Sequence, residues 1–302
     1  MKFIGYMLTY SLVWVLHLVP ERILYLLSDV CYVLAYHVLG YRKKVVYSNL
    51  KKAFPGHDRA EIRRIARKFY HHLCDTMLES AISHFYSEKK ALKRITYSNL
   101  EVLNDLHKSG KQVIAVLGHY GNWEYLSTLS LVTPYPFVAI YKPLRNKYYD
   151  RLVTRNRTRF GGIVTPMEKV FRKLLELKKQ NTPVITLNLS DQSPMLHKIQ
   201  YWTKFMGMDT PVYLGSEKLA RKLDAAVVFL KIRKIRRGRY EVETELICRD
   251  PAEMKIHEIT ERHVRILEDL IREEPAYWLW SHRRWKHSYE DFKERKAATN
   301  QK

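Results

Sequence analysis

The stretch "QVIAVLGHYGNWEY", residues 112–125, joins an apolar run to a glycine-flanked histidine and then to the start of a predicted helix. A short apolar run that ends at a glycine is typical of a buried strand in a parallel sheet. His119 stands where this strand ends, and Glu124 follows five positions later. Because ligands of open α/β sheets gather beyond the carboxyl ends of the strands, His119 lies where a functional group is expected.

The same alternation of short apolar runs and helical segments continues along the chain. "FVAIY" (137–141), "GIV" (162–164) and "VITLNL" (184–189) are predicted strands, and helices are predicted near 123–132, 146–160 and 167–180. Residues 225–235 and 239–248 flank "RRG" and predict an antiparallel hairpin, before a final helix over 259–273. The pattern predicts an α/β fold with a mostly parallel sheet flanked by helices.

The N-terminal region is strongly apolar. "FIGYMLTYSLVWVLHLV" (3–19) has one ionisable side chain, His17, and its 17 residues are at the short end of what spans a bilayer. No small-residue cleavage site follows, which favours a retained anchor over a signal peptide. The second apolar stretch, 23–41, carries Asp29 and His37, so an interfacial helix, a re-entrant segment and a core helix all remain open.

These patterns divide the chain into three parts. We predict a membrane anchor with an interfacial helix over 1–42, a single globular domain over 43–290 and a flexible tail over 291–302. The competing interpretation treats the first 39 residues as two ordinary core helices. After "FPGHD", Asp58 and Glu61 form a plausible capping pair for a long amphipathic helix. Its basic face is either solvated or rests on a membrane.

The net charge of +22 indicates polyanionic partners: nucleic acid, anionic lipid or an acidic carrier. The basic cluster at 42–44 directly after the apolar segments favours an anionic, cytoplasmic membrane surface. Binding of nucleic acid through "KIRKIRRGR" would leave the apolar N-terminus unexplained, so no nucleic acid is expected. The three cysteines are far apart and form no disulfide framework, and no metal or cofactor is expected because neither H-E-x-x-H nor a glycine-rich nucleotide loop occurs.

The spacing of His119 and Glu124 has a chemical use. The turn between them allows the carboxylate to reach back and accept the Nδ1 proton, which leaves Nε2 free to take a proton from an alcohol. Such an alcohol attacks an acyl carbonyl, and the lack of G-x-S-x-G favours direct attack over an acyl-enzyme. In the alternative interpretation, His119 is a loop histidine bonded to the start of the helix.

Five stretches together resemble the lipid A biosynthesis lauroyl/myristoyl acyltransferase family of the glycerolipid acyltransferase superfamily. They are the histidine, four residues, acidic residue motif in "HYGNWE", the region "RKKVVYSNLKKAFPGHDRAEIRRIARKFYHHLCDTMLES" and the blocks "YKPLRNKYYDRLVTRNRTRFGG", "LSDQSP" and "YWLWSHRRWK". They span most of the chain in the family's order. Ser190 stands where the family more often has proline.

The resemblance implies transfer of a fatty acyl chain from an acyl carrier protein or coenzyme A thioester to a hydroxyl of a membrane lipid. The implied acceptor is a lipid A precursor at the cytoplasmic face of a bacterial inner membrane, with an aminolipid or a lysophospholipid as alternatives. His119 would be the general base and Glu124 its orienter. The implied substrate-binding residues are Arg145, Asn146, Arg157, Arg159, Asp191 and Gln192.

Two arginine groups in these blocks also have plainer interpretations. Arg155, Arg157 and Arg159 alternate on a predicted helix, so at most two of them can face one site, and a solvated basic face is the alternative. "HRRW" (282–285) could place guanidinium groups near an acyl carrier or a lipid phosphate, or could form a surface stack of arginine on tryptophan.

Overall fold

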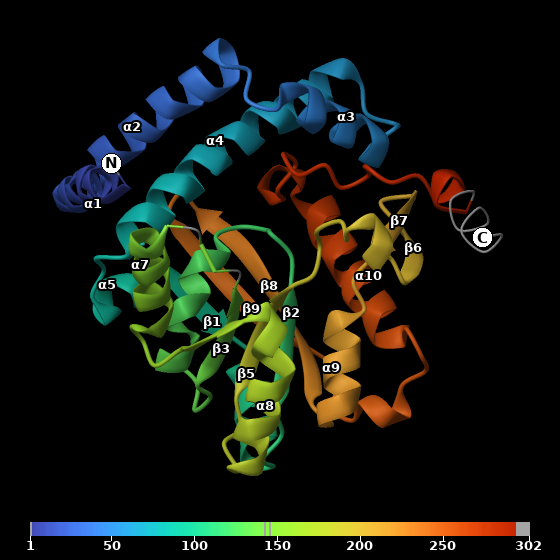
Figure 1. The fold of residues 1–302 in the computed structure, drawn as a ribbon. Helices are drawn as coiled ribbons and strands as arrows, with labels where there is room; N and C mark the ends of the chain where they lie inside the picture. Colours follow the sequence, from blue (N-terminus) through green and yellow to red (C-terminus); the bar gives the residue numbers. More distant parts are fainter. Residues whose placement is uncertain (1, 142, 145, 294–302) are drawn as a thin grey trace.

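The computed structural model describes residues 2–293 except Lys142 and Arg145. Its main sheet has the strand order β1-β9-β8-β2-β5-β3-β4 (Figure 1). The bounds are Ile95–Ser98 (β1), Val113–Leu117 (β2), Phe137–Tyr141 (β3), Ile163–Pro166 (β4), Ile185–Leu189 (β5), Ala226–Arg236 (β8) and Arg239–Cys248 (β9). A separate antiparallel ribbon pairs β6 (Tyr201–Phe205) with β7 (Met208–Val212).

The prediction of a mostly parallel sheet is confirmed. Strands β8, β2, β5, β3 and β4 run parallel, β9 pairs antiparallel with β8, and β1 pairs parallel with β9. The predicted hairpin is therefore present as part of the main sheet. Sequence patterns missed β1 and the β6–β7 ribbon, because these short strands are only partly buried and lack a continuous apolar run.

Helices cover both faces of the sheet. One core joins the sheet to α8 (Val170–Lys179), α9 (Gly215–Leu223) and α10 (Glu258–Glu273), and the other joins it to α5 (Glu88–Leu92), α6 (Leu100–Lys108) and η2 (Trp123–Leu131). All five residues of β2 are buried, as expected for a strand covered on both sides. The predicted helix over 123–132 is a 3₁₀-helix, and the helix before β5 begins with a 3₁₀ turn at Met167–Lys169 (η3).

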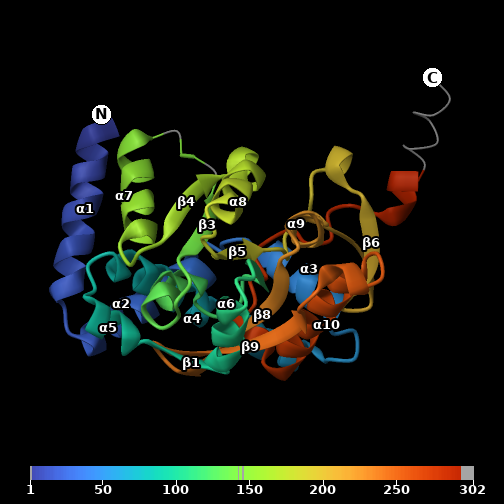
Figure 2. The same cartoon turned by 90° about the horizontal axis from the view of Figure 1, so that it is seen from below.

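The N-terminal helices lie against the long helix α4 (Arg59–Ser83), as Figure 1 shows for α2. They are α1 (Lys2–Leu18), α2 (Glu21–Tyr32), the π-helical turn η1 (Val33–Val38) and α3 (Lys43–Ala53). Figure 2 shows α1 beside α7 (Lys147–Thr158), where Tyr149 donates a hydrogen bond to Thr9 at 2.8 Å. The capping pair of α4 is confirmed, because Asp58 and Glu61 exchange side-chain and backbone hydrogen bonds.

Large apolar side chains are exposed along the first helices. They are Phe3, Ile4, Met7, Leu8, Leu12, Trp14, Val15 and Leu18 on α1, Ile23, Leu26, Leu27 and Val30 on α2, and Val33, Leu34 and Val38 on η1. Within the described residues no single helix is long and apolar enough to cross a bilayer. The bent pair Glu21–Val38 and Lys43–Ala53, with an angle of 87°, meets the length and composition test only when taken together.

A charged network ties α2 to the rest of the protein. Asp75 on α4 is buried and accepts hydrogen bonds from Ser28 at 2.7 Å and from Arg237, after β8, at 2.7 Å. Arg237 also pairs with Asp29 at 2.6 Å. The boundary expected at residue 42 stays a prediction, and most of the predicted tail, 294–302, lies outside the described residues.

Candidate active site

The loop after β2 places His119 at the carboxyl end of a central strand. Gly121 has φ +62°, and a Cβ atom there would lie 2.8 Å from Ile232 Cγ2. A Cβ atom on Gly118 would lie 2.6 Å from Leu267 Cδ1. The loop therefore needs glycine at both positions, one for close packing and one for close packing together with a left-handed backbone.

The carboxylate that holds the His119 imidazole is Asp191, which follows β5. His119 Nδ1 lies 2.6 Å from Asp191 Oδ1, and the His119 backbone N–H donates to Asp191 Oδ2 at 2.8 Å. Glu124 was expected to make the Nδ1 contact, and that expectation is wrong in this structure. The parallel pairing of β2 with β5 brings both strand ends to the same edge, so Asp191 reaches the ring directly while Glu124 lies beyond a turn.

The second ring nitrogen of His119 faces Gln192. Gln192 Nε2 lies 3.2 Å from His119 Nε2, and an amide N–H donates to an unprotonated ring nitrogen. With Nδ1–H directed at Asp191, Nε2 is the basic atom. Trp123 packs against the ring with its plane tilted by 73° and a centroid distance of 4.9 Å. Gln192 thus lies beside His119, and its role in substrate binding stays a prediction.

Charge and burial act in opposite directions on the His119–Asp191 pair. Burial by itself lowers the pKa of His119, but the charge and hydrogen bond of Asp191, with a smaller contribution from Glu124, raise this pKa above its usual value. Burial raises the pKa of Asp191, but His119 and the Trp278 hydrogen bond outweigh burial and hold this pKa below its usual value. Asp191 is therefore ionised and His119 is a strengthened base.

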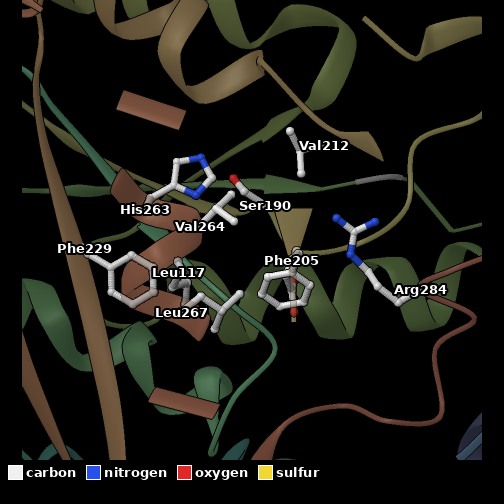
Figure 3. A pocket seen from close by; sticks show the side chains of 10 residues that line it. Leu117, Ser190, Phe205, Val212, Phe229, His263, Val264, Leu267 and Arg284 are labelled. Atoms are coloured by element: carbon white, nitrogen blue, oxygen red, sulfur yellow. The ribbon is translucent and has the colours of Figure 1, made fainter. Parts of the chain in front are cut away.

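Residues of the C-terminal block close the site behind Asp191. The buried Trp278 side chain donates from Nε1 to Asp191 Oδ2 at 2.8 Å. A small cavity lies on the far side of Asp191, where Figure 3 shows the Arg284 guanidinium near Phe205 and, at the other end, His263. Burial lowers the pKa of Arg284 to about 10, and the negative charge of Asp191 opposes this shift.

The structure divides "HRRW" (282–285) between interior and surface, because Arg284 is buried and Arg283 is exposed. Arg284 is 2% exposed and donates to the Pro211 carbonyl at 2.9 Å, so it neither contacts a partner at the surface nor stacks there on tryptophan. His282 Nε2 accepts a hydrogen bond from the Ser193 backbone at 3.1 Å, which fixes the loop that carries Asp191 and Gln192. Arg284 is therefore internal, whereas the surface roles expected for this block stay predictions for Arg283.

The front of the site is open. A cavity of about 440 Å³, here called the α4–α7 cavity, is lined by Trp123, Glu124, Met77 of α4 and Arg157 of α7, among others. Arg157 Nη2 lies 3.9 Å from Glu124 Oε1, and both side chains are partly exposed. A smaller cavity of about 60 Å³ continues beneath Trp123 between apolar side chains of the sheet. The structure therefore brings Arg157 to Glu124 at the edge of this cavity, and substrate binding by Arg157 stays a prediction.

Arg159 lies beside a second cavity. This α1–α7 cavity, of about 430 Å³, is lined by Tyr6 and Tyr10 of α1 and by Arg151, Arg155 and Arg159. Arg155 and Arg159 thus face one cavity and Arg157 the other, in agreement with the expectation that at most two of these arginines share a site.

The remaining predicted residues of this block have other surroundings. Arg159 donates through Nη1 and Nη2 to the carbonyls of His84 and Ser83 at 2.5 and 3.1 Å. Asn146 caps α7 by accepting from the Tyr148 backbone at 3.0 Å, so its described contact is structural. Arg145 lies outside the described residues.

Sequence analysis did not identify Glu79, a second carboxylate that holds the loop after β2 through Asn122. Glu79 on α4 is buried and accepts from Asn122 at 2.9 Å, from Tyr240 at 2.8 Å and from Tyr25 of α2 at 3.0 Å. Burial raises the pKa of Glu79. The signal was available: polar residues His72, Asp75, Glu79 and Ser83 recur at spacings of three and four on α4, which predicts one polar stripe.

The arrangement is an oriented imidazole with an ionised carboxylate behind it and an open, partly apolar cavity in front of it. Residues 2–287 match the family described as bacterial lipid A biosynthesis acyltransferase, and the chain belongs to this family. It is an acyltransferase, and the family supports transfer of an acyl group to a lipid acceptor.

A curated relative allows a more specific comparison. The chain is 22% identical over 279 residues to the lipid A biosynthesis lauroyltransferase of Escherichia coli (strain K12). The matched region covers 91% of this chain and 89% of the relative.

Proposed function

We propose that the protein transfers a fatty acyl chain from an acyl thioester to a hydroxyl of a membrane lipid, with His119 as the general base. The observation that carries this proposal is the orientation of the imidazole. Nδ1 is directed at Asp191, and Nε2 is directed toward Gln192 at the mouth of the site. Membership of the lipid A acyltransferase family makes a lipid A precursor the preferred acceptor.

The proposed reaction is a direct substitution. The acceptor hydroxyl replaces Gln192 as the hydrogen-bond donor to His119 Nε2 and transfers its proton to this nitrogen as its oxygen attacks the thioester carbonyl. When the tetrahedral intermediate collapses, the carbon–sulfur bond breaks and the thiolate leaves, taking the proton from His119. Asp191 stabilises the imidazolium formed between these steps, and the charge of Glu124 adds to this effect.

The α4–α7 cavity is the proposed acceptor site. It contains Glu124 and Arg157, and the neighbouring α1–α7 cavity adds a cluster of arginines next to the tyrosines of α1. Guanidinium groups bind phosphate through paired N–H donors, and tyrosine suits a membrane interface. A lipid with an anionic head and a free hydroxyl fits this combination. Arg157 and Arg159 are its proposed ligands, and Asn146 positions the helix that carries them.

The apolar surface of α1, α2 and η1 supports membrane association. The exposed apolar residues of these helices are grouped together, whereas ordinary surface apolar residues are scattered singly. Such grouped surfaces mark contacts with lipid or protein. The arginine-lined α1–α7 cavity lies beside α1, so a lipid could reach it by lateral diffusion. We place the protein at the cytoplasmic face of a bacterial inner membrane, where the basic surface meets anionic lipid.

The test combines an assay with lipid analysis. Purified protein in mixed micelles is supplied with a lipid A precursor and an acyl thioester, and products are measured by mass spectrometry. His119→Ala is expected to lower kcat by about 10³-fold or more with an unchanged melting temperature, as for loss of a general base. His57→Ala, in an exposed turn, is the matched control.

Two results would count against parts of this proposal. Near-parental transfer by folded His119→Ala protein would remove the mechanism. Transfer only to a lysophospholipid or an aminolipid would retain the mechanism and replace the acceptor. Lipids from cells that lack the protein should contain one species lighter by a single acyl chain, which identifies the acceptor.

A further inference from the structure

A groove between α8 and α9 approaches the His119 site and shares no lining residue with the α4–α7 cavity. Its volume is about 440 Å³, and its lining includes Ser190 and Gln192 at the inner end. Gln192 is the residue whose amide contacts His119 Nε2. The groove therefore leads to the same ring nitrogen as the proposed acceptor site, but along a separate path. It is named the α8–α9 groove below.

The middle of the α8–α9 groove is apolar. Val170 and Phe171 of α8 face Leu219 of α9, and Ile140 and Leu189 line the groove toward the sheet. The last two residues also line the small cavity beneath Trp123, so the apolar surface is continuous from the groove to the active site. Such a passage fits a long, uncharged arm better than a charged headgroup.

The α9 wall carries two exposed lysines. Lys218 and Lys222 are four residues apart and lie on the same face of α9. Lys218 Nζ donates to the amide of Gln200 at 2.5 Å, and Lys222 Nζ lies 5.3 Å from the ring centre of Phe171. Among the described residues neither lysine forms an ion pair with a carboxylate. Both ammonium groups are available to an anion.

Positive charge continues beyond the α8–α9 groove along the first turns of α8. Lys169 and Arg172 are exposed there beside Glu168, and the partly exposed Lys173 pairs with Glu176 at 2.8 Å. A basic face of this extent attracts a large acidic partner and speeds its encounter. A small anion would need only the two lysines of the groove. Basic residues outside the groove therefore favour an acidic protein over a free cofactor as the partner.

We propose, on the basis of the function above, that the α8–α9 groove receives the phosphopantetheine arm of an acidic acyl carrier protein. Lys218 and Lys222 bind the phosphodiester, the apolar middle holds the arm, and the thioester carbonyl reaches Gln192 and His119. The carrier protein rests on the basic face of α8. Donor and acceptor thus reach His119 through separate cavities, which suits direct transfer.

The first experiment measures KM for acyl carrier protein thioester and for acyl coenzyme A with Lys218→Glu/Lys222→Glu protein. Loss of two charge-assisted contacts predicts a rise of roughly tenfold or more in KM for the carrier protein thioester, with a smaller rise for coenzyme A. The effect should shrink as ionic strength increases. The control, Lys93→Glu/Lys108→Glu, places the same charge change near α5 and α6, on the opposite face of the sheet.

A second variant blocks the α8–α9 groove without changing charge. A Cβ atom on Gly215 meets no atom within 4 Å, so Gly215→Ala is expected to be neutral. Gly215→Trp places an indole at the groove wall. It should raise KM for the carrier protein thioester by about tenfold, because the arm loses part of its contacts with the groove. KM for the lipid acceptor should stay unchanged in both variants.

The outcomes separate this inference from the proposed function. If parental protein transfers acyl chains and both groove variants match their controls, the α8–α9 groove is not the donor site. An equal rise in KM for both donors would overturn the carrier protein as occupant. If parental protein transfers no acyl chain from either donor, the proposed function itself fails.

Discussion

The two sides of His119 differ in almost every physical property. Behind the ring, Asp191 and Trp278 are buried and hydrogen-bonded, with Arg284 close by. In front of it, Glu124 and Arg157 are partly exposed, 3.9 Å apart, and border an open cavity. Fixed charges in a dry environment act strongly and need no reorganisation, whereas open walls can adapt to a substrate. The buried side thus orients the imidazole, and the proposed function assigns substrate recognition to the open side.

Asp191→Asn, on the buried side of His119, should have the largest effect on kcat. We expect kcat to fall by about 10³-fold, because the imidazolium loses its ionised partner. The raised pKa of His119 depends on Asp191. Since only neutral His119 is a base, activity falls as pH decreases through this pKa, and its acid limb should move to lower pH in the variant. A pH profile of kcat/KM checks this, and an unmoved limb would contradict the assignment of Asp191.

Glu124→Gln is expected to have a smaller effect of a different kind. Glu124 contributes the smaller part of the His119 pKa shift and also lies beside Arg157. We expect a roughly 10- to 100-fold fall in kcat/KM, with KM for the lipid acceptor raised, because a partly screened charge is lost. Steady-state kinetics in both substrates measures this. A loss larger than that of Asp191→Asn would reverse the comparison.

Trp278→Phe should have the smallest effect on catalysis. It removes the hydrogen bond to Asp191 Oδ2 and keeps most of the packing. A lost bond to a buried charge predicts about 1.5–3 kcal/mol less stability and a fall in kcat of about 3- to 10-fold. Denaturant unfolding and the transfer assay measure the two quantities. Unchanged stability would show that this bond does not support Asp191.

The fold was predictable where local patterns are strong. Continuous apolar runs and the glycine-flanked histidine gave the parallel sheet and placed His119 at a strand end, because burial on both faces leaves a clear signal. The weak strands β1, β6 and β7 were missed because their exposed or partly exposed positions resemble loops.

The partner of His119 was not predictable from spacing. Glu124 is five residues away and Asp191 is 72, but pairing of β2 with β5 brings Asp191 closer. Register between non-adjacent strands depends on tertiary packing, which no local window contains. The same reason hid Arg284, whose burial follows from the packing of β6 and β7 against it.

The network that joins α2 to α4 bears on how the protein can be handled in the laboratory. A shortened version that starts at residue 43 would lose Ser28, Asp29 and Tyr25, and with them hydrogen bonds to the buried Asp75 and Glu79. Arg237 would still contact Asp75, and Asn122 and Tyr240 would still contact Glu79, but loss of hydrogen bonds to buried carboxylates is destabilising. Removing the apolar N-terminus to improve solubility would therefore damage the interior next to the His119 loop. Purification of the full-length chain in detergent is the better route.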